Sequence, residues 1–301
     1  MPARPTHPGY VELHCHSGFS FLDGASHPEE LALRAKELGY PALALTDHDG
    51  LYGSMEFAHA AREAGVQPLT GVELTLKECF PGREDDGPDP PEPTPSWHVT
   101  LLAAGPRGYG NLCRLVTEAP MERPRDDPGL PLEALLAGDR TEGIVCLTGC
   151  RRSPVLAALE SSAAEGEAMA RRFLRAFGTG NVFVELQANA VRGDAARGKA
   201  LGRLADRLGL PVVATGNVHY HRRERHRLQD VLTAIGHRST LDGSHAVRRP
   251  NACFHLASPD EMARRFRGRP DALTNTLLVA ERCADFDLTQ DLGYEFPDFQ
   301  G

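Results

Sequence analysis

Tyr10-Val11-Glu12-Leu13-His14-Cys15-His16 is the stretch of sequence that decides the fold. Its apolar start predicts a β-strand over residues 10–14, with two histidines at the strand end. Because alternate side chains of a strand point to the same face, His14 and His16 can bind one metal ion together. Taken alone, such a pair is more often structural, so a metal site requires further ligands from elsewhere in the chain.

Outward from this stretch, strand-like runs alternate with helical patterns, which predicts an α/β fold with a mainly parallel sheet or barrel. The other expected strands are 42–46, 67–76, 97–103, 144–148, 181–186 and 211–215. The expected helices are 28–38, 52–64, 108–117, 153–160, 164–177, 194–208, 222–236, 259–267 and 270–283. Pro28 is typical of a helix start, and Gly39, Gly65 and Gly209 are typical of helix ends.

The length of 301 residues favours one domain over residues 1–301. Residues 77–96 are rich in proline and acidic residues, a composition that predicts a mobile insertion. Residues 240–301 are expected to form a carboxyl-terminal extension that packs on the barrel.

The formal charge of −8 argues against a stand-alone nucleic-acid binder, so any contact with DNA must be local or assisted by metal ions. The 7 cysteines lack a CxxC spacing, which excludes a zinc ribbon and favours a reducing compartment. Neither a signal peptide nor a membrane span is recognisable. We therefore expect a cytoplasmic protein without a membrane partner.

Further candidate ligands stand at or near the ends of the expected strands, where barrels of this class place their functional side chains. They are Asp23, His48, Glu73, His98, Cys150, Asn217 and His219, in addition to His14 and His16. His98 is the exception, because it opens its strand. Imidazole, carboxylate and thiolate together suit manganese, zinc or iron. Two such ions would activate a water for attack on a phosphate ester, so no protein nucleophile is expected beyond a metal-bound hydroxide.

Several motifs resemble the PHP (polymerase and histidinol phosphatase) family, and in particular the amino-terminal PHP domain of bacterial C-family, error-prone DNA polymerase III alpha subunits. They are Glu12-Leu13-His14-Cys15-His16-Ser17, Ser20-Phe21-Leu22-Asp23-Gly24-Ala25, Leu45-Thr46-Asp47-His48-Asp49-Gly50, Gly71-Val72-Glu73, Leu147-Thr148-Gly149-Cys150 and Asn217-Val218-His219-Tyr220. The resemblance runs from about residue 10 to at least residue 299.

This resemblance implies a distorted (β/α)7 barrel with up to three divalent metal ions at the carboxyl-terminal ends of the strands. The first ion would be bound by His14, His16, Glu73 and Asn217. Glu73 would bridge to a second ion at His98 and Cys150, and Asp23, His48 and His219 would hold a third. Active family members usually have Asp where this chain has Asn217, so the first ion is expected to bind more weakly.

Substrate binding is expected from Arg151 and Arg152, which follow Cys150, and from Arg222 beyond the last strand. For each of these arginines, a solvated helix face is the plain alternative. The resemblance implies a metal-dependent phosphoesterase that hydrolyses phosphodiester bonds of DNA ends, a 3′–5′ exonuclease linked to replication or repair proteins. The alternatives are a phosphatase of small phosphate esters, as in histidinol phosphatase, and a catalytically weak structural module of a polymerase.

Overall fold

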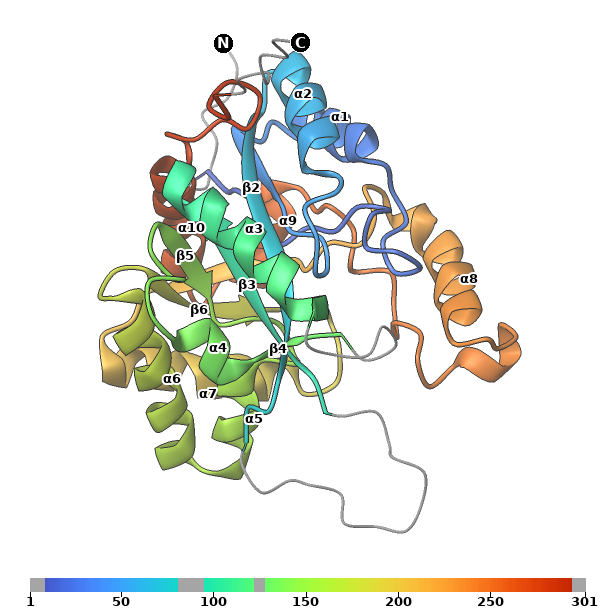
Figure 1. Ribbon diagram of the computed structural model, residues 1–301. Helices are drawn as coiled ribbons and strands as arrows, with labels where there is room; N and C mark the ends of the chain where they lie inside the picture. The colour runs from blue at the N-terminus through green and yellow to red at the C-terminus, as the bar shows by residue number, and fades with distance from the viewer. Residues whose placement is uncertain (1–8, 81–94, 122–127, 294–301) are drawn as a thin grey trace.

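The computed structural model describes residues 9–80, 95–121 and 128–293, and it centres on a curled sheet surrounded by helices (Figure 1). The strands are β1 (Ala42–Leu45), β2 (Gln67–Lys77), β3 (Trp97–Ala103), β4 (Leu130–Pro131), β5 (Ile144–Leu147), β6 (Val182–Gln187) and β7 (Val212–Thr215). The helices are α1 (Pro28–Glu37), α2 (Ser54–Ala64), α3 (Pro106–Met121), α4 (Leu132–Leu136), α5 (Pro154–Ser161), α6 (Ala163–Phe177), α7 (Asp194–Leu208), α8 (His226–Gly236), α9 (Pro259–Arg265) and α10 (Pro270–Cys283). Two short 3-10 helices, η1 (Arg223–Arg225) and η2 (Asp242–Ser244), flank α8.

The sheet runs in the order β1-β2-β3-β5-β6-β7, and β4 pairs with the end of β2. The β1/β2, β5/β6 and β6/β7 pairs are parallel, as the alternation of strands and helices predicts. By contrast, β3 is antiparallel to both of its neighbours. The expected barrel-like α/β fold is therefore confirmed, with one reversed strand that the sequence pattern did not reveal.

Residues 10–16 link the two edges of this sheet, but the continuous strand that we expected over residues 10–14 does not form. The backbone of Ala44 in β1 donates to Glu12 O, and the backbone of His16 donates to Val218 O on the other side. The Glu12 carboxylate also accepts from the backbone of Gly216 at 2.8 Å. At Gly216 a side-chain carboxylate thus accepts a hydrogen bond from the backbone, where a regular strand would offer a carbonyl oxygen. The segment pairs with its neighbours through two isolated bridges, Glu12 to Leu43 and Cys15 to Val218.

The inward faces of the strands change from apolar to polar along the barrel. Leu69, Leu102, Val145, Phe183 and Val213 form one buried cluster together with residues of α10. Further along the same faces, β6 and β7 carry Glu185 and Thr215 two residues on, and β2 carries Glu73 four residues on; all three are buried. Side chains an even number of residues apart on a strand share a face, so these polar residues continue the inward faces of the apolar ones. Helix α10 packs against the apolar end of the barrel, and the polar end is the candidate site.

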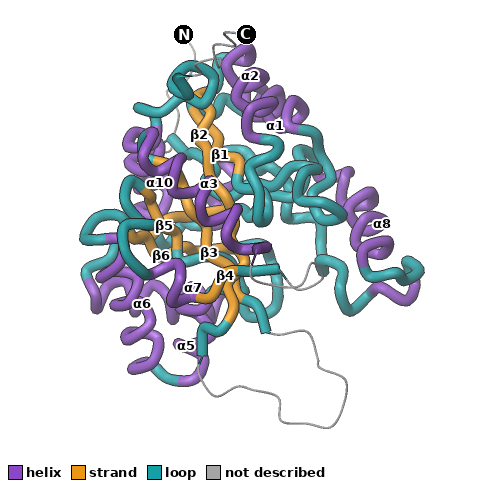
Figure 2. The backbone as a smooth tube through the Cα atoms, in the orientation of Figure 1, coloured by secondary structure: helices purple, strands orange, loops and turns teal. Residues whose placement is uncertain are grey.

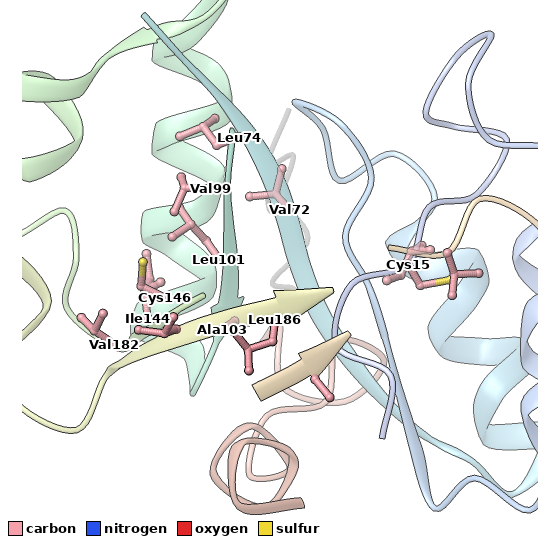
Figure 3. Packing of buried hydrophobic residues seen from close by; sticks show 14 of the residues in the cluster. Cys15, Val72, Leu74, Val99, Leu101, Ala103, Ile144, Cys146, Val182 and Leu186 are labelled. Carbon is pink, nitrogen blue, oxygen red and sulfur yellow. The ribbon is translucent and has the colours of Figure 1, made fainter. Parts of the chain in front are cut away.

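A second, larger cluster fills the space between the sheet and the surrounding helices. Figure 3 shows its centre, where Val72, Val99 and Cys146 come from three neighbouring strands. The helices lie around the strands, and α8 lies apart from the other helices (Figure 2). Two of the predicted glycines end helices: Gly65 and Gly209 directly follow α2 and α7 and take the left-handed conformation.

Most of the expected insertion at 77–96 lies outside the described residues, as do residues 294–301 of the expected extension. Within the described part of that extension, α10 packs on β7, and Asn275 Nδ2 donates to Val212 O at 2.8 Å. None of the helices described is both long and apolar enough to cross a membrane.

Candidate metal centre

The polar end of the barrel brings together side chains from well-separated parts of the chain. The 10–16 segment contributes two histidines, the loop before α1 contributes Asp23, and the other ligands lie in the strands or in the loops that follow them. Three overlapping groups hold their ligand atoms within 4.8 Å of one another: His14, His16 and Glu73; His48, Glu73 and His98; and His16, His48 and His219. The predicted ligands thus converge on a single site.

Glu73 lies at the centre of this cluster and is buried. Its Oε1 is 3.2 Å from His14 Nε2, and its Oε2 is 2.9 Å from His48 Nδ1 and 3.2 Å from His98 Nδ1. Burial alone would raise the pKa of Glu73, but the imidazoles of His98, His14 and His48 hold that pKa well below its usual range. The side chain is therefore an anion facing several imidazoles, an arrangement suited to bridging two ions.

The reversed direction of β3 explains the position of His98. His98 is the second residue of β3 and pairs with Thr75, near the end of β2. Because the two strands run in opposite directions, the beginning of β3 lies at the same end of the barrel as the end of β2. His98 therefore obeys the strand-end rule in space, although it departs from it in sequence.

Cys150 lies beside His98 at this edge, with Sγ 3.6 Å from His98 Nδ1. The backbone of Arg152 donates to the sulfur at 3.5 Å. Burial, and then the neighbouring Glu73 carboxylate, raise the pKa of the Cys150 thiol well above its usual value. A bound cation would therefore have to displace the thiol proton.

Asp23 forms the outer part of the cluster. Its Oδ2 is 3.2 Å from His48 Nε2 and 3.1 Å from His219 Nε2. The ring of His16 stacks on that of His48, with 4.4 Å between the centroids. The group Asp23, His48 and His219 is thus continuous with the group around Glu73.

Unpartnered buried atoms show that these residues fit a metal. Among the described residues, His14 Nε2, His16 Nε2, Glu73 Oε1 and Asn217 Oδ1 are buried and make no hydrogen bond, although His14 Nε2 and Glu73 Oε1 lie 3.2 Å apart. Leaving a polar atom buried and unpaired costs on the order of 1–3 kcal/mol, and a cation would remove this cost. Nitrogen, oxygen and sulfur donors in one cluster suit manganese, zinc or iron.

Comparison with known proteins assigns this arrangement to a family. The PHP domain model matches residues 12–189. The chain belongs to the PHP domain family. The resemblance inferred from the motifs is thereby confirmed.

This PHP domain is 40% identical over 303 residues to the error-prone DNA polymerase of Symbiobacterium thermophilum, covering 95% of this chain and 26% of that one. It is 41% identical to the error-prone DNA polymerase of Mycolicibacterium paratuberculosis, covering 91% and 25%. The chain therefore spans about a quarter of the length of these relatives. Among solved structures, a protein proposed to be a metal-dependent phosphoesterase, from Bifidobacterium adolescentis, matches with a TM-score of 0.46 and 17% identity over 71% of this chain and 88% of that one.

Glu185, which the sequence analysis missed, holds the ring of His14 on the side away from Glu73. Its Oε1 is 2.7 Å from His14 Nδ1 and accepts from Thr215 Oγ1 at 2.5 Å and from Gln187 Nε2 at 2.8 Å. When Nδ1 of an imidazole donates to a carboxylate, Nε2 is left free to bind a metal. A charged residue inside the apolar run of β6 was the available signal, because a buried charge requires a partner.

Asp47 supports the amino-terminal part of the site. Its carboxylate accepts from the backbone of Ser17 at 2.6 Å and from the hydroxyls of Ser17 and Ser20, both at 2.7 Å. Ser20 Oγ is also 3.1 Å from His16 Nδ1. Asp47 therefore orients this loop and, through Ser20, the His16 ring.

A cavity of about 830 Å³ opens onto the cluster. The predicted Arg151 and Arg152 line it, and so do three arginines that we did not predict: Arg197, Arg248 and Arg249. Arg222 does not line this cavity, because its guanidinium binds Glu37 on the outer surface at 2.8 Å. Five arginines therefore line one cavity of a chain with a net charge of −8, and three of them, Arg197, Arg248 and Arg249, are paired with aspartates.

Proposed function

We propose that this PHP domain is a metal-dependent phosphoesterase that removes nucleotides from DNA ends as a 3′–5′ exonuclease. The observation that carries this proposal is the convergence of imidazole, carboxylate and thiolate side chains around Glu73, with buried donor atoms that have no other partner. When bound, divalent manganese, zinc or iron ions would activate water and hold the phosphate oxygens.

We assign the ligands to three ions as the resemblance to the PHP family implies. His14, His16, Glu73 and Asn217 would hold the first ion. The second would bind Glu73, His98 and Cys150, and the third would bind Asp23, His48 and His219. His48 Nδ1 lies 2.9 Å from Glu73 Oε2, so His48 is able to serve the second position as well.

The other residues would orient these ligands and the substrate. Glu185 holds the His14 ring, and Asp47 holds the loop that carries His16. Arg151 and Arg152 line the cavity and would bind phosphate oxygens, a role for which guanidinium is well suited. Arg222 is left out of this assignment because Glu37 occupies its guanidinium.

DNA is the proposed substrate because the relatives are named as error-prone DNA polymerases and because arginines line the cavity. The domain would then work in the cytoplasm beside replication or repair proteins. A reducing compartment also suits a site in which the Cys150 thiolate is a ligand. All seven cysteines lie within the described residues and are unpaired there.

A direct test follows nucleotide release from single-stranded DNA labelled at its 5′ end. The protein would be stripped with a chelator and reloaded with manganese. Shortening from the 3′ end is expected, and it should be lost in Glu73→Gln. The matched control is Glu142→Gln, which changes a surface carboxylate that pairs with Arg107. Absence of shortening with manganese, zinc and iron would refute the exonuclease proposal.

Two other functions each have one observation in their favour. A cavity of about 830 Å³ is of a size that binds small ligands, which favours a phosphatase of small phosphate esters. The neutral Asn217 favours a structural module with reduced activity. Rapid phosphate release from small monoesters without DNA degradation would support the former, and loss of thermal stability on chelation without any hydrolysis would support the latter.

A further inference from the structure

Arg249 occupies the outer part of the candidate metal centre. Its Nη1 donates to Asp23 Oδ1 at 2.5 Å, and its Nη2 donates to Asp23 Oδ2 at 3.1 Å. The same Nη2 contacts His219 Nε2. A permanently charged guanidinium thus lies against two of the three side chains assigned to the third ion.

The fold holds Arg249 in this place. Asn251 Nδ2 donates to the backbone oxygen of Asn189 at 2.9 Å, which anchors the loop just beyond Arg249. Further on, Phe254 O accepts from the backbone of His219 at 2.8 Å. The Phe254 ring lies 5.3 Å from Arg249 Cζ, close enough for a cation–π contact. Backbone pairing and ring packing therefore aim this guanidinium at Asp23.

The contacts of Asp23 leave little room for a second cation. Both carboxylate oxygens accept from Arg249, and Oδ2 is also the oxygen that faces His48 and His219. A divalent ion at Oδ2 would lie beside the guanidinium, and two cations at such a distance repel each other strongly in a partly buried site. The ion and this orientation of Arg249 are hard to accommodate together.

We infer that Arg249 and a divalent ion compete for Asp23, so that Arg249 is a positioning residue that weakens the third metal position. The inference rests on the proposed function, because it presupposes that Asp23, His48 and His219 bind an ion. Ion binding would displace a guanidinium that is already tethered at the cavity. The displaced guanidinium would then be free to bind a phosphate group in the same cavity. Ion binding at the third position and phosphate binding would therefore favour each other.

The test measures manganese binding to the chelator-stripped protein, by calorimetry and by the metal content after dialysis at graded manganese concentrations. Arg249→Ala should bind its weakest manganese ion on the order of 10-fold more tightly than the unaltered chain, since a competing charge is removed. Arg249→Lys should fall in between, because it keeps the charge and loses the two-pronged geometry. In an Asp23→Asn background, Arg249→Ala should have no effect.

The matched control is Arg248→Ala. Arg248 lines the same cavity and carries the same charge, but it pairs with Asp230 at 2.9 Å instead of with Asp23. An equal gain of affinity in both variants would show a general charge effect and overturn the inference. Unchanged or weaker manganese binding in Arg249→Ala would also overturn it. If neither the variant nor the unaltered chain binds manganese, zinc or iron, the proposed function fails as well.

Discussion

Asn217 places a neutral amide oxygen where a carboxylate would contribute a full charge. Its Oδ1 is buried without a hydrogen-bond partner in the described part of the chain, and its backbone has a φ of 47°. Asn and Asp both tolerate this left-handed conformation, so the backbone gives no reason against Asp at this position. The residue therefore offers a clean comparison of ligand charge at constant shape.

We predict that Asn217→Asp will bind manganese on the order of 10-fold more tightly and will raise the hydrolysis rate, because the ligand gains a negative charge. Metal content after dialysis and calorimetric titration measure the affinity. Asn275→Asp makes the same charge change on α10, where the amide donates to Val212 O, and should leave manganese binding unchanged. Equal occupancy and equal rates in Asn217→Asp and the unaltered chain would show that residue 217 is not a ligand.

Glu185 acts on the metal through His14, so its removal should weaken binding without removing a ligand. Glu185→Gln loses the charge that faces His14 Nδ1 at 2.7 Å. We expect manganese affinity to fall roughly 10–100-fold, the range typical of partners that orient a metal-binding histidine. Calorimetric titration checks this, and circular dichroism checks that the fold is retained. Affinity within about twofold of the unaltered chain would contradict a supporting role.

The candidate site was largely predictable residue by residue, because its ligands stand in short motifs at strand ends. Glu185 and Arg249 were not predicted, for different reasons. Glu185 is a single charge in an apolar strand, and its partner His14 is 171 positions away. Arg249 reaches the site from a loop beyond the last strand, and long-range contacts such as the backbone pairing of His219 with Phe254 and the anchor at Asn251 bring it there.

At the scale of elements, several of the longer segments were predicted best. The bounds of α7, α10 and β3 agree with the expected 194–208, 270–283 and 97–103. β4 and α4 were missed because they are short, with two and five residues. The direction of β3 was missed because strand direction depends on connections and pairing, which the periodicity of a segment does not encode.

Gly149 shows how an element boundary positions a ligand. It has a φ of 95°, and a Cβ at this residue would lie 2.1 Å from the backbone oxygen of His98. Gly149→Ala should therefore destabilise the domain by roughly 2–4 kcal/mol and displace Cys150, because the backbone must move at a buried position. Urea denaturation measures the free energy of unfolding, and thiolate-to-cobalt absorption of the cobalt-loaded protein reports whether Cys150 still binds.

The matched control for this change is Gly110→Ala in α3. A Cβ there meets no atom within 4 Å, so alanine should stabilise the helix by roughly 0.5–1 kcal/mol. If the two variants change the free energy of unfolding equally, the close approach of Gly149 to His98 is not what requires glycine.

At the scale of the whole molecule, several arginines gather around one cavity although the chain as a whole is acidic. The chain carries a net charge of −8, yet Arg151, Arg152, Arg197, Arg248 and Arg249 all line one cavity. Net charge predicted that any contact with DNA would be local, and under the proposed function the cavity would be the place of that contact. The total could not indicate where the basic residues gather, because the fold collects them from α7, from the loop after β5 and from the segment between η2 and α9.

The barrel joins an apolar end covered by α10 to a polar end that contains several buried donor atoms, so metal binding should contribute to the stability of the whole domain. An ion that binds only the folded state stabilises it by about 2.7 kcal/mol at 100 times its dissociation constant. Chelation should therefore lower Tm by roughly 4 °C for each ion lost, and added manganese should restore it. Differential scanning calorimetry measures this change in Tm, and in Glu73→Gln chelation should change Tm much less. A Tm unaffected by chelation in protein shown by analysis to contain metal would mean that the ions contribute nothing to folding, and that the unpartnered atoms around Glu73 are satisfied in another way.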